Sequence, residues 1–225
     1  MPDPDVCQRA EQLLEVGRAE AAIDLLTRQL ASDPDDAWAL RLLSAANADL
    51  ERYADSLRWA DRAVSVEPLA ANSWHHRAAA LLGLDRIDEA VAAARRAIEL
   101  APNDWTEHYL LGQTLERSPG GEREILAVAR TTVDLAPNEA QAHVLLGIAH
   151  DLVGEQPAAI AAYRGALAID PQNSPARNNL AVIDLRDGRH EQALPNLLLG
   201  VGAVVAAGLT LRGSARKQRS GPREP

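Results

Sequence analysis

Five prolines recur along the chain at a nearly constant interval, each after a short ending such as "LAP" or "IDP". These marker prolines are Pro34, Pro68, Pro102, Pro137 and Pro171. The intervals between them are 34, 34, 35 and 34 residues. Proline cannot continue the helix before it, and the residue preceding a proline is biased away from helical backbone angles. A period of this length indicates one structural unit that is copied along the chain.

Small residues keep the same phase as the marker prolines. Positions twelve residues before them hold Ala22, Ser56, Ala90, Ile125 and Ala159. Positions ten residues after them are small as well, for example Ser44, Gly112 and Gly147. Two closely packed helices need small side chains where they meet, so each unit is expected to be a pair of helices.

The segment 143–171, "HVLLGIAHDLVGEQPAAIAAYRGALAIDP", resembles the tetratricopeptide repeat family, which has a period of 34 residues. It carries Leu146, Gly147, Gly154, Tyr163 and Pro171 where that family expects them. The resemblance implies an all-α fold, a right-handed α-solenoid of antiparallel helix pairs with about six units. Twelve helices are then expected, with turns near residues 17, 34, 51, 68, 84, 102, 119, 137, 154, 171 and 188.

The sequence predicts three segments: a repeat solenoid over residues 1–193, an apolar helix over 194–211 and a basic tail over 212–225. An Asn or Asp after each marker proline is expected to cap the next helix. The sixth unit is expected to begin with Ser174 as cap and Pro175 in the first helical position, and its second helix near His190. The sequence "RSPGGERE" at 117–124 contains the extra residue of the fourth unit, which we interpret as a tolerated turn insertion.

No motif for catalysis, a cofactor or a metal is present. The sequence has no glycine-rich phosphate loop, no H-E-x-x-H and no cysteine cluster. His108 and His143 each follow a marker proline by six residues, a phase that holds Leu40 and Trp74 in earlier units, so these histidines are interpreted as packing residues. We therefore predict a non-catalytic protein without cofactor or metal.

The charge distribution argues against a nucleic-acid partner. The net charge is −9, and the last fourteen residues contribute +4, so the rest of the chain carries −13 and repels phosphate backbones. Cys7 is the single cysteine, which fits a reducing compartment. The start of the sequence has neither a basic segment nor an apolar run, so a cytoplasmic protein is expected.

The resemblance places a partner on the inner face of the solenoid, formed by the first helix of each pair. Inward positions follow each marker proline by four, seven, eleven and fourteen residues, and small side chains fill some of them, such as Ala45, Ala48 and Ala79. The candidate partner-binding residues are Trp38, Arg41, Asn72, His75, Leu82, Tyr109, Gln113, Val144 and Ile148. Trp38 and Tyr109 fit either ordinary packing or binding hot spots. Only Arg41 resembles the cationic clamp with which some relatives hold an acidic C-terminal peptide.

The uncharged segment near the C-terminus can either pack on protein or contact a membrane. Twenty residues without a charge, 192–211, contain the stretch that begins at Leu194 and ends at Leu211. Such a segment is buried on all sides or lies in lipid. We expect a helix over 194–211 that packs on the last unit or on a second copy of the chain; membrane contact is the alternative.

These observations predict a protein–protein interaction scaffold that binds a peptide or partner segment in its groove. One alternative is a membrane-associated assembly factor anchored through residues 194–211. Another is a regulatory module of an enzyme on a different chain. The partner, a protein or peptide, is not identified by the sequence.

Overall fold

The structure is a computed structural model that describes residues 4–196. Within this range the chain forms helices only, and no strand is found. The helices are α1 (Pro4–Glu15), α2 (Ala19–Ser32), α3 (Ala37–Asp49), α4 (Tyr53–Val66), α5 (Ala71–Gly83), α6 (Ile87–Leu100), α7 (Trp105–Glu116), α8 (Glu122–Leu135), α9 (Ala140–Leu152), α10 (Gln156–Ile169) and α11 (Ser174–Arg186). Residues 190–196 are helical too, so the predicted twelfth helix begins at His190 as expected. All predicted turns separate these helices, which confirms the all-α solenoid of helix pairs.

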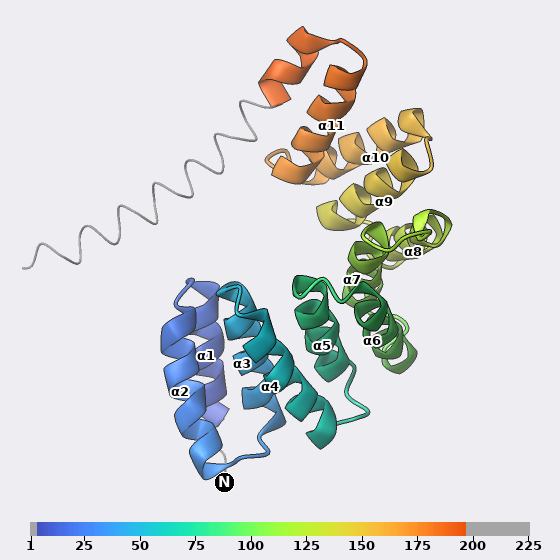
Figure 1. The fold of residues 1–225 in the computed structure, drawn as a ribbon. Helices are drawn as coiled ribbons and strands as arrows, with labels where there is room; N and C mark the ends of the chain where they lie inside the picture. The colour runs from blue at the N-terminus through green and yellow to red at the C-terminus, as the bar shows by residue number, and fades with distance from the viewer. Residues whose placement is uncertain (1–3, 197–225) are drawn as a thin grey trace, which may run out of the picture. The chain divides into compact units, whose positions relative to one another are not determined.

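The chain divides into two compact bodies, Met1–Leu135 and Ala136–Pro225. The N-terminal body contains α1 to α8 as four successive pairs, coloured from blue to green in Figure 1. We call α1, α3, α5, α7, α9 and α11 the first helices, and their partners the second helices. In the N-terminal body the backbone of each first helix comes close to that of the next first helix, whereas the backbones of successive second helices lie farther apart. The first helices therefore lie on the more closely spaced side of this body.

Short polar side chains cap three of the first helices. Asp36, Asp104 and Asn173 each stand two residues after a marker proline, and each side chain accepts a hydrogen bond from a backbone N–H of the first helical turn. The same place holds Ala70 and Glu139 before α5 and α9, where no side-chain cap forms. The prediction that Ser174 caps α11 was wrong, because Asn173 has the extended backbone of a cap and Ser174 is already helical.

Every marker proline has a backbone carbonyl that accepts a hydrogen bond from a side chain. Six residues after three of these prolines, the ring N–H of Trp74, His108 and His143 donates to the carbonyl, at 2.9 Å in each case. Arg177 donates to Pro171 at 3.1 Å from the same phase. At Pro34, where that phase holds Leu40, the guanidinium of Arg62 donates instead, at 2.6 Å. These proline-carbonyl bonds satisfy acceptors that the preceding helix leaves free.

Within a helix pair, the small position ten residues after one marker proline packs against the small position twelve residues before the next. The Ser44 hydroxyl of α3 lies 3.0 Å from the Ser56 hydroxyl of α4, and both residues are buried. Ile125 of α8 stands at the same phase of the fourth unit as Ser56 does in its own, and it is fully buried.

The insertion in the fourth unit lies in the turn between α7 and α8, as predicted. Gly120 has φ +81°, a conformation that favours glycine, and a Cβ on Gly121 would come 2.5 Å from the Leu115 carbonyl oxygen. Arg117 anchors the end of α7, because it donates to the Leu82 carbonyl and pairs with Asp85 at 2.7 Å.

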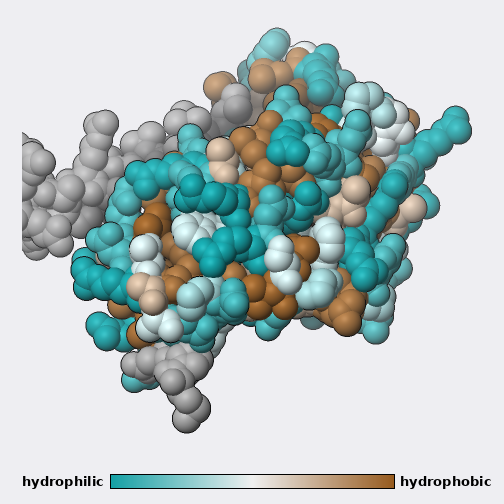
Figure 2. Space-filling model, turned by 60° about the horizontal axis from the view of Figure 1, so that its bottom comes forward, coloured by the Kyte–Doolittle hydropathy of each residue, from teal (hydrophilic) through white to brown (hydrophobic). Residues whose placement is uncertain are grey.

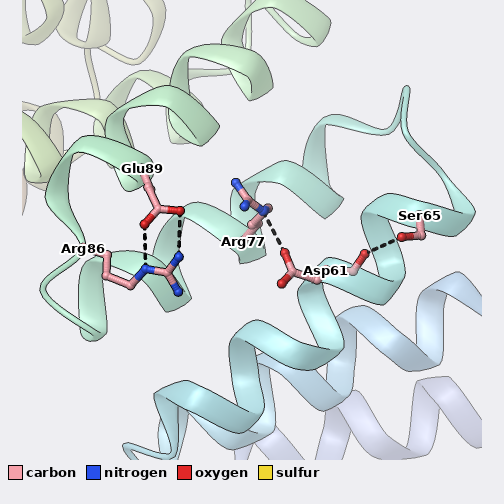
Figure 3. A network of polar contacts seen from close by, with 5 residues as sticks. All are labelled: Asp61, Ser65, Arg77, Arg86 and Glu89. Carbon is pink, nitrogen blue, oxygen red and sulfur yellow. Dashed lines mark hydrogen bonds and ion pairs between the residues drawn. The ribbon is translucent and has the colours of Figure 1, made fainter.

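Ion pairs connect neighbouring helices on the surface of the N-terminal body. Figure 3 shows Arg77 of α5 donating to Asp61 of α4 at 2.8 Å, while the Ser65 hydroxyl donates to the Asp61 carbonyl. In the same view Arg86 binds both carboxylate oxygens of Glu89 at 2.7 Å. Exposed pairs of this kind typically contribute about 0.2–1 kcal/mol each, so packing stabilises the body more than charge does.

The predicted apolar helix over 194–211 and the basic tail over 212–225 lie outside the described residues, apart from the first three. In the part of the chain that the structure describes, no helix has the length and hydropathy of a membrane span.

Candidate functional site

Seven of the nine predicted partner-binding residues lie on three consecutive first helices of the N-terminal body. Helices α3, α5 and α7 contact one another in that order. We call their inward positions, with the small residues between them, the first-helix face. Asn72 is exposed on this face, and the other six side chains are half-buried. They are Trp38, Arg41, His75, Leu82, Tyr109 and Gln113. In the view of Figure 2, hydrophobic surface is repeatedly interrupted by hydrophilic side chains.

Two of these side chains are already engaged within the body. The Trp38 indole N–H donates to a Glu11 carboxylate oxygen of α1 at 2.9 Å, and the ring packs against the buried cluster around Leu26 and Leu40. The Arg41 guanidinium pairs with Glu67 at 2.5 Å, and its side chain is only 15% exposed. Arg41 is therefore not a free cation, and the face has no clamp for an acidic peptide terminus.

His75 contacts a buried carboxylate that the sequence analysis missed. Its Nδ1 lies 2.9 Å from Glu107 Oε2, and Glu107 is 3% exposed. Glu107 stands five residues after Pro102, a phase that holds Ala39, Ser73 and other small residues elsewhere. Glu107 could have been noticed in the sequence, because it is a charged residue at a repeat position where the other units have small residues.

The neighbouring His76 is held neutral by its surroundings. Its ring meets the His75 ring edge-on, with centroids 5.7 Å apart. Burial lowers the pKa of His76 to about 3, and the nearby His75 and Arg41 contribute to the shift in the same direction. At neutral pH this end of the face therefore adds no positive charge from His76.

The first-helix face also contains small residues and one aromatic side chain of α7. Ala45, Ala48 and Ala79 are half-buried at inward positions of α3 and α5. Tyr109 packs edge-on against Trp105 with ring centroids 6.0 Å apart. Burial raises the pKa of Tyr109, and the Glu116 carboxylate raises it further, so the hydroxyl keeps its proton and can donate a hydrogen bond.

The two remaining predicted residues belong to the C-terminal body. Val144 of α9 is 6% exposed and packs in a cluster with Tyr163 and Leu180, and Ile148 packs against that cluster. Helix α11 contacts α9, so residues of the following repeat cover this part of α9. Val144 therefore offers almost no surface to a partner, and we leave it out of the proposal below.

Nothing in residues 4–196 assembles a metal site or a reactive thiol. No group of three or more His, Cys, Asp or Glu side chains in this range could hold a metal ion. Cys7 is 1% exposed, and its sulfur lies 3.9 Å from Asp36 Oδ2. Burial raises the pKa of the Cys7 thiol to about 12, and the Asp36 carboxylate adds to the shift, so the thiolate nucleophile is suppressed.

Comparison with known proteins agrees with this architecture. Two models described as "Tetratricopeptide repeat" match residues 71–104 and 123–174. A thermophilic tetratricopeptide repeat protein of Thermus thermophilus is similar in structure, with 21% identity, a TM-score of 0.68, and coverage of 84% of this chain and 97% of that one. MamA of Desulfovibrio magneticus RS-1 has 20% identity and a TM-score of 0.61, over 75% of this chain and 94% of its own.

A third similar structure, YrrB, is described as a tetratricopeptide repeat protein with an unusual peptide-binding site. It has 18% identity and a TM-score of 0.56, over 84% of this chain and 97% of its own. No curated protein matches the sequence.

Stacked helix pairs with first helices on the closely spaced side define an α-solenoid, a class whose members act as protein-interaction scaffolds. Because residues 71–104 and 123–174 match tetratricopeptide repeat models, the chain contains tetratricopeptide repeats.

Proposed function

We propose that the protein binds a segment of a partner protein on its first-helix face. The observation that carries this proposal is the set of half-buried side chains at inward positions of α3, α5 and α7, among them Leu82 and Tyr109. Large rigid aromatic side chains such as Tyr109 are enriched in binding hot spots.

The charges on this face favour a weakly charged segment. Arg41 is neutralised by Glu67, and His75 is already bonded to Glu107. The groups left to contact a partner are the Tyr109 hydroxyl, the side-chain amides of Asn72 and Gln113, the aliphatic Leu82 and one carboxylate, the exposed Glu116. A partner segment with apolar side chains and hydrogen-bonding backbone groups is the best match for this surface.

The experiment adds a large side chain at one position of the first-helix face and leaves the rest of the body unchanged. Ala79→Trp places a bulky ring on the first-helix face, while Ala92→Trp places the same ring on the exposed side of α6. Full-length wild type and both variants are used to retain proteins from native lysate. We expect at least one protein to be retained by wild type and Ala92→Trp and lost by Ala79→Trp.

Affinity for that protein is then measured for Tyr109→Ala, and the expected loss is about 2 kcal/mol with unchanged helicity. Trp38 is less suited to this test, because its indole also packs on the core. If every retained protein binds wild type and Ala79→Trp equally, the first-helix face is not the binding surface.

A further inference from the structure

A groove on the second-helix side of the molecule differs between the two bodies. In the C-terminal body it runs between α10 and residues 190–196, and has a volume of about 660 Å³. Its walls include the side chains Pro157, Ile160, Arg164, Leu180, Gln192 and Asn196. Ile160 is half-buried and Leu180 is 8% exposed, so the floor is aliphatic, while Arg164 is exposed at the rim.

The N-terminal body has the same groove between α6 and α8, but an ion pair crosses it. Arg95 binds Glu124 at 2.8 and 2.9 Å. Two separate cavities, of about 400 and 350 Å³, lie along this groove, and both are lined by Arg95 and Glu124. The ion pair thus divides one groove into two smaller parts.

The repeat register shows what changes in the C-terminal body. Arg164 stands seven residues before Pro171, as Arg95 stands seven before Pro102. Ala193 and Ile125 occupy the same position in their repeats. Gln192 and Glu124, each one residue earlier, are therefore equivalent too. The guanidinium is therefore kept while the carboxylate opposite it is replaced by an amide, and among the described residues Arg164 has no ion pair.

The other charged groups of the groove pair with one another and not with Arg164. Arg189 and Asp184, which also line it, pair with each other at 2.9 Å, and Arg189 additionally binds Asp187 at 2.6 Å. Gln192 and Asn196 are neutral and can donate hydrogen bonds. Among the described residues, the groove thus presents one guanidinium without an ion-pair partner above an aliphatic floor.

We propose that this groove binds an acidic segment of a partner protein, with an Asp or Glu carboxylate on Arg164 and an aliphatic side chain over Ile160 and Leu180. The carboxylate takes the place that Glu124 occupies in the N-terminal body. Arginine binds carboxylates through paired N–H donors, which gives such a contact both strength and orientation. This surface is separate from the first-helix face and does not depend on the function proposed for that face.

The test selects random displayed peptides on the immobilised full-length protein. We expect the selected peptides to share an acidic residue beside an aliphatic one, and to bind Arg164→Gln at least about tenfold more weakly. Gln192→Glu should have the same effect, because it restores the carboxylate of the crossing ion pair. Arg28→Gln, which removes an exposed arginine on α2, should leave the affinity unchanged.

Four results would overturn the proposal. The first is a set of selected peptides without a shared acidic residue. The second is unchanged affinity for both Arg164→Gln and Gln192→Glu. In the third, Tyr109→Ala abolishes binding of the same peptides, which would assign them to the first-helix face. Tighter peptide binding by Glu224→Gln would likewise identify the protein's own tail, not a partner, as the occupant.

Discussion

Tyr163 of α10 lies directly against Gly147 of α9, so closely that a Cβ at position 147 would stand 2.4 Å from the tyrosine Cε1 atom. Tyr163 is 1% exposed and belongs to the core of the C-terminal body. The absence of a side chain at Gly147 is therefore part of the packing, and not a requirement of backbone conformation.

Gly147→Ala should destabilise the protein by about 1–3 kcal/mol, because the added methyl group forces the Tyr163 ring out of position. Chemical denaturation of the variant measures the loss. The control is a double-mutant cycle with Tyr163→Leu, in which the smaller side chain should remove most of the penalty of Gly147→Ala. Additive effects of the two substitutions would contradict this explanation.

Glu51→Gly should stabilise the protein by roughly 0.5–1 kcal/mol. Glu51 has φ +58° in the turn between α3 and α4, where the equivalent residues Gly17 and Gly154 are glycine. A non-glycine residue in this conformation typically costs roughly 1–2 kcal/mol, and the extra chain entropy of glycine offsets part of the gain. Thermal denaturation measures the change, and the reverse substitution Gly154→Glu should lower the melting temperature.

Ser73→Ala should leave the protein unchanged or stabilise it by about 1 kcal/mol. Ser73 is 0% exposed, and its hydroxyl has no hydrogen-bond partner. Burying an unpaired hydroxyl is unfavourable, and alanine also has the higher helix propensity. The matched control is Ser56→Ala, which removes a hydroxyl bonded to Ser44 and should destabilise by about 1 kcal/mol. Equal losses of unfolding free energy in both variants would show that Ser73 does have a partner.

His75→Ala should destabilise the protein by about 1–3 kcal/mol, because it leaves the buried Glu107 carboxylate without its hydrogen bond. Adding Glu107→Ala should recover part of this loss, since the same phase is occupied by alanine at Ala39 and Ala142. Equilibrium unfolding of wild type, the two single variants and the double variant gives the coupling free energy between His75 and Glu107. No recovery in the double variant would mean that Glu107 is well solvated in the absence of His75.

His76 should make stability depend on pH between about 6.5 and 3. Burial first, and then His75 and Arg41, lower its folded-state pKa to about 3 from the ordinary 6.5. The unfolded chain therefore binds a proton that the folded protein excludes, and the free energy of unfolding falls as the pH drops through this window. His76→Gln should flatten that slope, whereas His190→Gln, at an exposed position, should not. Identical slopes in wild type and His76→Gln would contradict the prediction.

The repeat period predicted the helices and turns well because proline and small residues act locally. A proline cannot continue the helix that precedes it, and the residues at 22, 56, 90, 125 and 159 had to lie where two helices meet. Ile125, the large exception among them, is buried as well.

The candidate site was less predictable, because its properties depend on residues far along the chain. The inward phase of Trp38 and His75 could be read from the sequence, but their partners Glu11 and Glu107 are 27 and 32 residues away. Phase also did not reveal that Val144 is buried, since the following repeat covers it. The position of a residue in the repeat indicates which side of the helix it is on. It does not indicate whether another residue of the chain already forms a hydrogen bond with its side chain.

The proline-carbonyl bonds show how divergent copies of one repeat can remain structurally equivalent. A tryptophan, two histidines and two arginines perform the same task at five consecutive joints, and one of them reaches in from a different helix. Each turn requires only a side chain long enough to bring one N–H to the carbonyl oxygen of the marker proline. Different residue types can therefore replace one another in this role. A position can thus differ from copy to copy and still supply the same hydrogen bond in most of them.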